Sequence, residues 1–197
     1  MVLQHIILII LWLQFSIFHS FFASEKYKSF MQKFMKEKYK YHRILYSIFA
    51  FLNLSVIIIY QFSINNVLLW KVPFIEIVIT DTCIIIASFT MVYFAVKFFF
   101  YLSGADIFLQ TKKTQTLIIS NLYKFVRHPL YTATLLLVWS IFFRLPYVSM
   151  LISSACITIY TITGIYFEEK KLIKDFGDSY IQYRKKTPML IPNFSKP

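Results

Sequence analysis

Ionisable side chains stand at the start of a long apolar run in the stretch KFVRHPLY, residues 124–131. Arg127 is a permanent cation that binds anions, and His128 can gain or lose a proton near neutral pH. Pro129 follows, and proline suits the first turn of a helix because the N–H it lacks would have no intrahelical partner there. The tripeptide therefore predicts a helix start that also carries two groups able to do chemistry.

Two carboxylates follow the next apolar runs, because Glu168 lies 40 positions after His128 and Glu169 is beside it. Such residues can be ordinary interface groups paired with neighbouring lysines, and for Glu169 alone that explanation is about as good as a functional one. An Arg, a His and two Glu at the ends of apolar runs are more typical of a functional site. We therefore treat Arg127, His128, Glu168 and Glu169 as one candidate site.

Several other kinds of site are absent from the sequence. The three glycines, at 104, 164 and 177, form neither a G-x-G-x-x-G nor a P-loop motif. Cys83 and Cys156 fall in apolar runs with no Cys-His spacing, so we expect packing residues and no metal site. No Ser-His-Asp or Cys-His arrangement is suggested by spacing.

The composition indicates what must position these groups. Of 197 residues, 58% are hydrophobic and only 15% charged, and the mean hydropathy is +0.61. Ordinary soluble domains are about half apolar and about a quarter charged. Several runs approach the roughly 20 residues that cross a bilayer. We expect an all-α, polytopic integral membrane bundle with spans at residues 2–22, 44–62, 73–102, 129–145 and 146–167.

The fourth and fifth expected spans are joined only by the corner at Arg144, Leu145 and Pro146, with Pro146 opening the fifth. So short a connection forces an antiparallel hairpin. The start of the fourth span and the end of the fifth then lie on the same side of the membrane. The hairpin would bring Glu168 and Glu169 back to Arg127 and His128.

The distribution of charge predicts the orientation. Of the 21 Lys and Arg residues, 18 fall in residues 23–43, 103–128 and 168–197, two (Lys71 and Arg144) fall on the opposite side, and Lys97 lies inside the third expected span. With five spans the three basic segments share one face, which the positive-inside rule makes cytoplasmic, and the N-terminus is external. The net charge of +12 is explained by attraction to anionic lipid headgroups, so we expect no nucleic-acid partner.

The segment EEKKLIKDFGDSYIQYRKK, residues 168–186, alternates charged and apolar residues at helical spacing. This pattern predicts a C-terminal amphipathic helix on the cytoplasmic membrane surface. Gly177 is expected to stop the helix, and Asp178 to cap a new one. Such a segment would close over the mouth of the hairpin.

These motifs carry a resemblance. RHPLY at 127–131, followed by a hairpin and by EEKKLIKDFGDSYIQYRKKTPMLIP at 168–192, resembles the C-terminal signature of the isoprenylcysteine carboxyl methyltransferase superfamily of membrane methyltransferases. That group includes phosphatidylethanolamine N-methyltransferases and bacterial methanethiol S-methyltransferases. FHSFFAS and YHRILYS in the N-terminal half resemble the NnrU-like and methanethiol S-methyltransferase branch. This branch implies a multi-pass protein of a prokaryotic inner membrane.

The resemblance implies S-adenosylmethionine as methyl donor and a small thiol or lipophilic acceptor. It also divides a single membrane domain into residues 1–102 on the acceptor side and residues 103–197 as the cofactor-binding hairpin and lid. Expected in catalysis are Glu168, Arg127 and His19, with His19 or His128 taking the proton of a thiol. Expected at the cofactor are Tyr123, His128, Pro129, Tyr131, Glu168, Glu169, Tyr180 and Arg184.

One departure bears on the acceptor. Relatives in this superfamily often carry an arginine just before the Glu pair, and this chain has Gly164, Ile165, Tyr166 and Phe167 there. An acceptor carboxylate would need that cation, so S-methylation is favoured over carboxyl O-methylation. Two alternatives stay open: an NADPH-dependent reductase of the steroid 5α-reductase type, and a non-enzymatic NnrU-like membrane protein.

Overall fold

The computed structural model describes residues 1–97 and 121–193, and this part of the chain is helical with no named strand. The all-α expectation is confirmed. The helices in chain order are α1 (Val2–Ala23), α2 (Glu25–Met35), the 3-10 helix η1 (Lys36–Tyr41), α3 (His42–Ser63), α4 (Phe74–Lys97), the 3-10 helix η3 (Asn121–Lys124), α6 (Pro129–Arg144), α7 (Val148–Phe176) and α8 (Asp178–Lys186).

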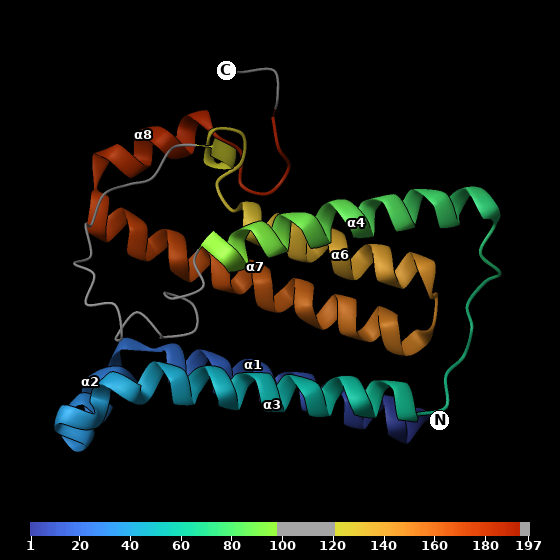
Figure 1. The fold of residues 1–197 in the computed structure, drawn as a ribbon, viewed down its shortest axis with the longest axis horizontal. Helices are drawn as coiled ribbons and strands as arrows, with labels where there is room; N and C mark the ends of the chain where they lie inside the picture. The colour runs from blue at the N-terminus through green and yellow to red at the C-terminus, as the bar shows by residue number, and fades with distance from the viewer. Residues whose placement is uncertain (98–120, 194–197) are drawn as a thin grey trace.

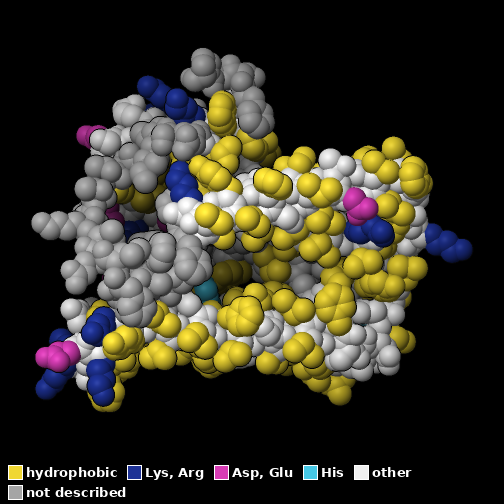
Figure 2. Space-filling view, viewed as in Figure 1, with side chains coloured by type: hydrophobic (Ala, Val, Ile, Leu, Met, Phe, Trp, Pro, Cys, Tyr) yellow, Lys and Arg dark blue, Asp and Glu magenta, His cyan; other side chains and the backbone are white. Residues whose placement is uncertain are grey.

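Two groups of helices meet along α7. Figure 1 shows α1 beside α3 on one side of the molecule, and α4 beside α6 on the other. α7 packs against both α1 and α6 and so connects the two groups. In Figure 2 the surface is hollowed between α3 and α4. α8 and η3 lie together at the end of the α6–α7 pair, where the candidate site is expected.

Membrane-spanning length is a property of four helical stretches in the described part of the chain. Four helical stretches are long and apolar enough to cross a bilayer: Val2–Ala23, Glu25–Ser63, Phe74–Lys97 and Val148–Phe176. α6 has 16 residues and extends about 24 Å, less than the ~30 Å hydrocarbon core. The chain is therefore a multi-pass helical membrane protein. The end of the third expected span, residues 98–102, lies outside the described residues.

The corner between α6 and α7 corrects one expected boundary. Pro146 does not open the last long helix, which begins at Val148. The segment after α3 explains the difference, because Leu69 N–H donates to Pro146 O over 2.8 Å and Val148 N–H donates to Val67 O over 3.1 Å. These bonds hold Pro146 in an extended corner, so the helix starts after it.

A second correction concerns residues 168–186. The expected amphipathic helix does not begin at Glu168, because α7 continues without a break to Phe176 and only α8 is separate. Gly177 ends α7 as predicted, with φ of 54°. Asp178 is not the cap; Gly177 occupies that position and Asp178 lies in the first turn of α8. The charged residues leave the α7 hydrogen-bond ladder intact, and only the left-handed backbone of Gly177 interrupts it.

Side-chain hydrogen bonds join α1, α3 and α7 inside the bundle. Trp12 Nε1–H donates to Ser153 Oγ over 2.8 Å, and the Ser153 hydroxyl donates to Gln61 Oε1. Around them lies an apolar cluster that includes Leu8, Trp12, Ile57 and Ile64. Because lipid competes for apolar contacts, such interhelical hydrogen bonds and close packing help to fix the helix pairing. Cys83 and Cys156 are half-buried.

Candidate functional site

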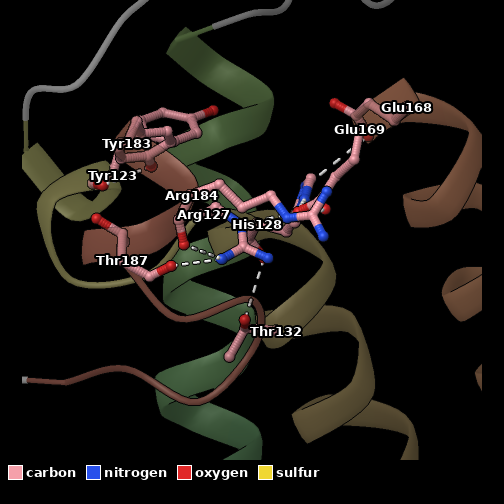
Figure 3. Close-up of polar contacts among 9 residues, drawn as sticks. All are labelled: Tyr123, Arg127, His128, Thr132, Glu168, Glu169, Tyr183, Arg184 and Thr187. Carbon is pink, nitrogen blue, oxygen red and sulfur yellow. Dashed lines mark hydrogen bonds and ion pairs between the residues drawn. The ribbon is translucent and has the colours of Figure 1, made fainter. Parts of the chain in front are cut away.

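The α6–α7 hairpin brings His128 to the two carboxylates. His128 caps the start of α6 and is buried, while Glu168 and Glu169 lie on α7. Its Nε2 is 3.2 Å from Glu169 Oε1, where the imidazole must donate because a carboxylate only accepts. Its Nδ1 lies 3.9 Å from Glu168 Oε2. Residues about 40 positions apart therefore form one cluster, drawn in Figure 3.

Arg127 is the most extensively bonded member of the cluster. Its Nε donates to Glu169 Oε1 over 2.7 Å, and both side chains are nearly buried. Its Nη1 donates to the carbonyl oxygens of Arg184 and Thr187 (Figure 3). Three of the five guanidinium N–H donors are thereby used by this chain. Arg127 thus ties the end of α8 to α7.

The segment after α8 forms a strap over the start of α6. We use "strap" for residues 187–193. Pro188 O and Met189 O accept from the N–H groups of Arg127 and His128, over 2.9 and 3.2 Å. Leu190 O accepts from the Thr132 hydroxyl over 2.8 Å. The strap bonds two backbone donors just before α6 and so holds the Arg-His pair in place.

Three parts of this site were not expected from the sequence: Thr132, Thr187 and the strap. Each of them contributes a hydrogen bond to a backbone carbonyl, and such bonds leave little trace in residue type. The one available signal was TPMLIP, residues 187–192, since a segment with prolines at both ends is extended and cannot continue α8. An extended segment beside a helix start can supply carbonyl acceptors to the unpaired N–H groups there.

α8 adds a second cation and two tyrosines. Arg184 Nε lies 3.7 Å from Glu169 Oε2, and about half of the Arg184 side chain is exposed. Tyr183 donates from its hydroxyl to Tyr123 O over 2.6 Å, which joins α8 to η3. Tyr180 is fully buried, and within the described residues its hydroxyl has no hydrogen-bond partner. α8 therefore covers the cluster with aromatic rings and one accessible guanidinium.

Burial raises the pKa of Tyr123, Tyr180 and Tyr183 at this end of the molecule. For Tyr183 burial raises the pKa to about 12, against a smaller lowering by the Arg127 cation. For Tyr180 the pKa is raised by burial and then by the negative charge of Glu169. For Tyr123 the pKa is raised by burial and then by Glu168. All three are neutral hydrogen-bonding groups at physiological pH, not anions.

The first turn of α6 carries the remaining expected residues. Pro129 is buried at the first helical position, where its missing N–H costs nothing. The Tyr131 ring centre is 5.7 Å from that of His128. Tyr131 also contacts the Glu168 carboxylate and lies near Tyr160 of α7. Tyr131 therefore faces both the cluster and the interior of the bundle.

His19 lies in a different group of side chains. Its Nε2 is 2.8 Å from the Tyr46 hydroxyl, and its ring stacks on Phe15 at 5.4 Å and meets Tyr160 edge-on at 5.8 Å. Tyr160 precedes Glu168 by eight positions on α7, about 12 Å along the helix axis. His19 therefore lies beside a part of α7 that is further into the bundle than the cluster. Its Nδ1 is buried without a partner among the described residues.

Two members of the cluster remain open to a ligand. The Glu168 side chain is 44% exposed, lies 3.9 Å from His128 and contacts Tyr131, and Arg184 is half-exposed. Glu169, in contrast, is enclosed by Arg127, His128 and Arg184. The described residues contain no group of three or more His, Cys, Asp or Glu that could hold a metal ion. The arrangement presents one partly exposed carboxylate and one half-exposed guanidinium beside neutral tyrosines.

Comparison with known proteins gives several relatives. "Methanethiol S-methyltransferase 1" of Bradyrhizobium diazoefficiens is 28% identical over 197 positions, covering 95% of this chain and 66% of that protein. "Methanethiol S-methyltransferase" of Crocosphaera subtropica is 39% identical over 74 positions, covering 38% of this chain and 28% of that protein. "Protein-S-isoprenylcysteine O-methyltransferase" of Schizosaccharomyces pombe is 36% identical over 83 positions, covering 41% and 34%.

The chain thus spans about two thirds of the length of the first of these relatives and less than a third of the second. No solved structure matches it. A family model described as "NnrU protein" matches residues 7–190, which include every residue of the cluster and His19. On this match over nearly the whole chain, the protein belongs to the NnrU family.

Proposed function

We propose that this protein is a membrane-bound, S-adenosylmethionine-dependent methyltransferase that acts on a small thiol or lipophilic acceptor, with sulfur favoured over a carboxylate. The observation that carries the proposal is the cluster at the mouth of the α6–α7 hairpin. There a buried Arg127–His128–Glu169 core holds Glu168 and Arg184 open to a ligand. The relatives named as methyltransferases support the same reaction class.

The open groups fit the chemistry of the methyl donor. S-adenosylmethionine carries a carboxylate, an ammonium group, ribose hydroxyls and an adenine, and when bound it supplies an electrophilic methyl group on a sulfonium. Arg184 can bind a carboxylate, and Glu168 can bind an ammonium or hydroxyl groups. Tyr123 and Tyr131 offer aromatic faces, which also attract a cation. The unpaired hydroxyl of buried Tyr180 is a further donor or acceptor.

The residues of the chain then divide into positioning and binding roles. Arg127 positions Glu169 and the end of α8, since its bonds go to this chain. His128 orients Glu169, and Pro129 opens the helix that carries them. Glu168 is the carboxylate we assign to the reaction centre. Catalysis by such a site rests on alignment and exclusion of water more than on covalent chemistry.

The acceptor side is assigned to α1, α3 and α4, within residues 1–102. For a thiol acceptor, only the thiolate is a good nucleophile. His19 is the proposed proton acceptor, because an ionisable residue inside a membrane bundle is more often functional than not. Its Nε2 is engaged by Tyr46, which leaves Nδ1 for the acceptor. The hollow between α3 and α4 in Figure 2 offers a route from the bilayer.

The proposed orientation follows the charge distribution. The cluster, α2 and α8 would lie at the cytoplasmic surface, with the N-terminus and the Arg144 corner outside. A soluble methyl donor would then reach the cluster from the cytoplasm, and an apolar acceptor would enter from the membrane. The expected cytoplasmic segment 103–128 falls partly in residues 98–120, outside the described part of the chain.

The direct test incubates purified protein with methyl-labelled S-adenosylmethionine and a panel of thiols, prenylcysteines and lipid amines. We expect label to appear in a thiol product. Calorimetric binding of S-adenosylmethionine should weaken at least tenfold in Glu168→Gln, because that change removes an open carboxylate from a charged ligand. Glu37→Gln on η1 is the matched control and should bind normally. Unchanged binding in Glu168→Gln would refute the assignment of the site.

Competition with NADPH separates the alternatives. The proposal predicts that NADPH does not displace S-adenosylmethionine. Displacement by NADPH together with reduction of an added substrate would establish a reductase instead. Binding of neither cofactor to folded protein would favour a non-enzymatic NnrU-like role.

A further inference from the structure

A stripe on the outer face of α2 is separate from the candidate site. Its residues are Lys26, Ser29, Phe30 and Lys33, spaced i, i+3, i+4 and i+7, so they lie on one face of the helix. Together with Glu25 they line a hollow of about 460 Å³. All four stripe residues are exposed. The stripe places a cation at each end of a short concave surface, with a hydroxyl and an aromatic ring between them.

The contacts of Tyr27 explain how α2 is oriented so that this stripe points outward. Tyr27 packs its ring against Phe21 and Phe22 at the end of α1, with centre distances of 5.0 and 4.9 Å, and against His42 at the start of α3. Ser24 caps the helix by accepting from Tyr27 N–H. α2 is therefore fixed to the ends of α1 and α3 through Tyr27. Lys26, Ser29 and Lys33 lie roughly 100–160° around the helix from Tyr27, and Phe30 lies beside Tyr27 at the edge of the stripe; all four are exposed.

Among the described residues, no acidic side chain neutralises the two lysines of the stripe. Glu25 pairs with Lys28 over 3.3 Å and with Lys171 of α7 over 2.9 Å. In the described part of the chain neither Lys26 nor Lys33 has an ion-pair partner. Residues 25–43 contain seven Lys and Arg against two acidic residues, Glu25 and Glu37. The hollow therefore lies in a region of excess positive charge, which favours the binding of an anion.

Apolar side chains continue from the stripe. Phe30 and Phe34 stack at 6.4 Å with an interplanar angle of 8°, and both are largely exposed. Two parallel phenyl rings beside lysines would be unusual on a surface that faces only water, because a large apolar area would stay unburied there. They are a suitable surface for acyl chains at the depth of the headgroups. α2 directly follows the membrane-length helix α1, so the stripe lies at a membrane boundary.

We propose that the stripe Lys26–Ser29–Phe30–Lys33 is a binding site for an anionic phospholipid. The headgroup phosphate sits between the two lysines and the Ser29 hydroxyl, and the acyl chains run along Phe30 and Phe34. Lys26 and Lys33 are seven positions apart, about 10 Å along the helix, so two long flexible side chains can reach one headgroup from opposite ends. This inference goes beyond methyl transfer and does not depend on it.

The experiment measures lipid retention by native mass spectrometry. Full-length protein in detergent is equilibrated with equal amounts of phosphatidylglycerol and phosphatidylcholine. We expect phosphatidylglycerol to be retained in preference by about 30-fold, since each lysine near an anionic headgroup contributes roughly fivefold. The double variant Lys26→Gln/Lys33→Gln should lose most of that preference. Equal retention of the two lipids by the unaltered protein would overturn the site.

A matched variant tests whether the lipid preference comes from this site or from the overall positive charge of the segment. Lys36→Gln/Lys38→Gln on η1 removes the same charge from the neighbouring exposed segment and should keep the preference for phosphatidylglycerol. An equal loss in both double variants would mean that only the overall surface potential acts, and the site would be wrong. Glycerol phosphate at the same concentration should not displace the lipid, because it cannot use Phe30 and Phe34. Displacement by glycerol phosphate, or burial of the stripe by a second copy of the chain, would also refute the proposal.

Discussion

Two arginine–carboxylate pairs lie at opposite ends of α6, and they differ in almost every respect except distance. Arg127, just before the helix, meets Glu169 over 2.7 Å with side-chain exposures of 9% and 11%. Arg144, its last residue, meets Asp81 over 3.0 Å with exposures of 38% and 51%. One pair is enclosed by other polar groups, and the other is partly open to its surroundings.

The surroundings of the two pairs explain the difference in their roles. Arg127 also binds two carbonyl oxygens, and Glu169 also meets His128 and Arg184. A buried pair pays a large desolvation cost, so it is not kept for stability alone. The exposed Arg144–Asp81 pair links α6 to α4 and, like most exposed pairs, contributes little. The comparison shows an enclosed, multiply bonded pair at the Arg127 end of α6 and a partly exposed pair at the Arg144 end.

The largest expected effect comes from breaking the buried pair. Arg127→Met should destabilise the protein by about 3–5 kcal/mol, because it leaves the Glu169 charge and two carbonyls without their partner. Arg144→Met, the matched change at the other end, should cost about 0–1 kcal/mol. The free energy of unfolding in mixed micelles measures both. Similar losses in the two variants would contradict the distinction between the ends.

A smaller effect is expected at the turn that brings α8 to the buried pair. Gly177 has φ of 54° and ψ of −132°, a conformation that disfavours any side chain, although an added Cβ would meet nothing within 4 Å. Gly177→Ala should therefore cost about 1–3 kcal/mol through backbone strain alone. Gly164→Ala, inside α7 and equally uncrowded, should stabilise by about 0.5–1 kcal/mol. Thermal unfolding midpoints that shift in opposite directions in the two variants would support this prediction, and shifts in the same direction would contradict it.

The hydrogen bond between α8 and η3 is expected to contribute less than the buried ion pair. Tyr183→Phe removes the hydroxyl that donates to Tyr123 O and should cost about 1 kcal/mol. Proteolysis in the 178–186 segment should become faster, because α8 loses one of its attachments. Tyr166→Phe on the exposed surface of α7 is the control. Unchanged protection in Tyr183→Phe would show that Arg127 and the strap hold α8 without the tyrosine.

A further effect is a pH dependence at the same residue. The pKa of Tyr183 is raised by burial from 10.0 to about 12. A pKa raised in the folded state stabilises the protein fully below the unfolded value, and the stabilisation is lost as pH rises through the folded value. The unfolding midpoint should therefore fall between about pH 10 and pH 12, and less so in Tyr183→Phe. An identical alkaline slope in that variant would assign the loss to other groups.

The sequence predicted the membership of the candidate site better than its bonds. The short corner at residues 144–146 forces a hairpin, so Arg127 and His128 had to return to Glu168 and Glu169 whatever the details of packing. Residue type could not show that Glu169 would be enclosed while Glu168 stayed open. That difference depends on which way each side chain leaves α7 relative to α6, a matter of helix rotation. The roles of these residues and the orientation in the membrane stay predictions.

What the sequence by itself determined is the class of molecule: apolar runs of membrane length, a basic excess in three segments, and an RHP start paired with a later Glu-Glu. These follow from composition and spacing, which act locally along the chain. Only the tertiary structure decided that the strap carbonyls bind Arg127 and His128, that His19 pairs with Tyr46, and that Pro146 stays outside α7. Those features depend on hydrogen bonds between segments far apart in sequence, and such bonds form only when packing brings the segments together.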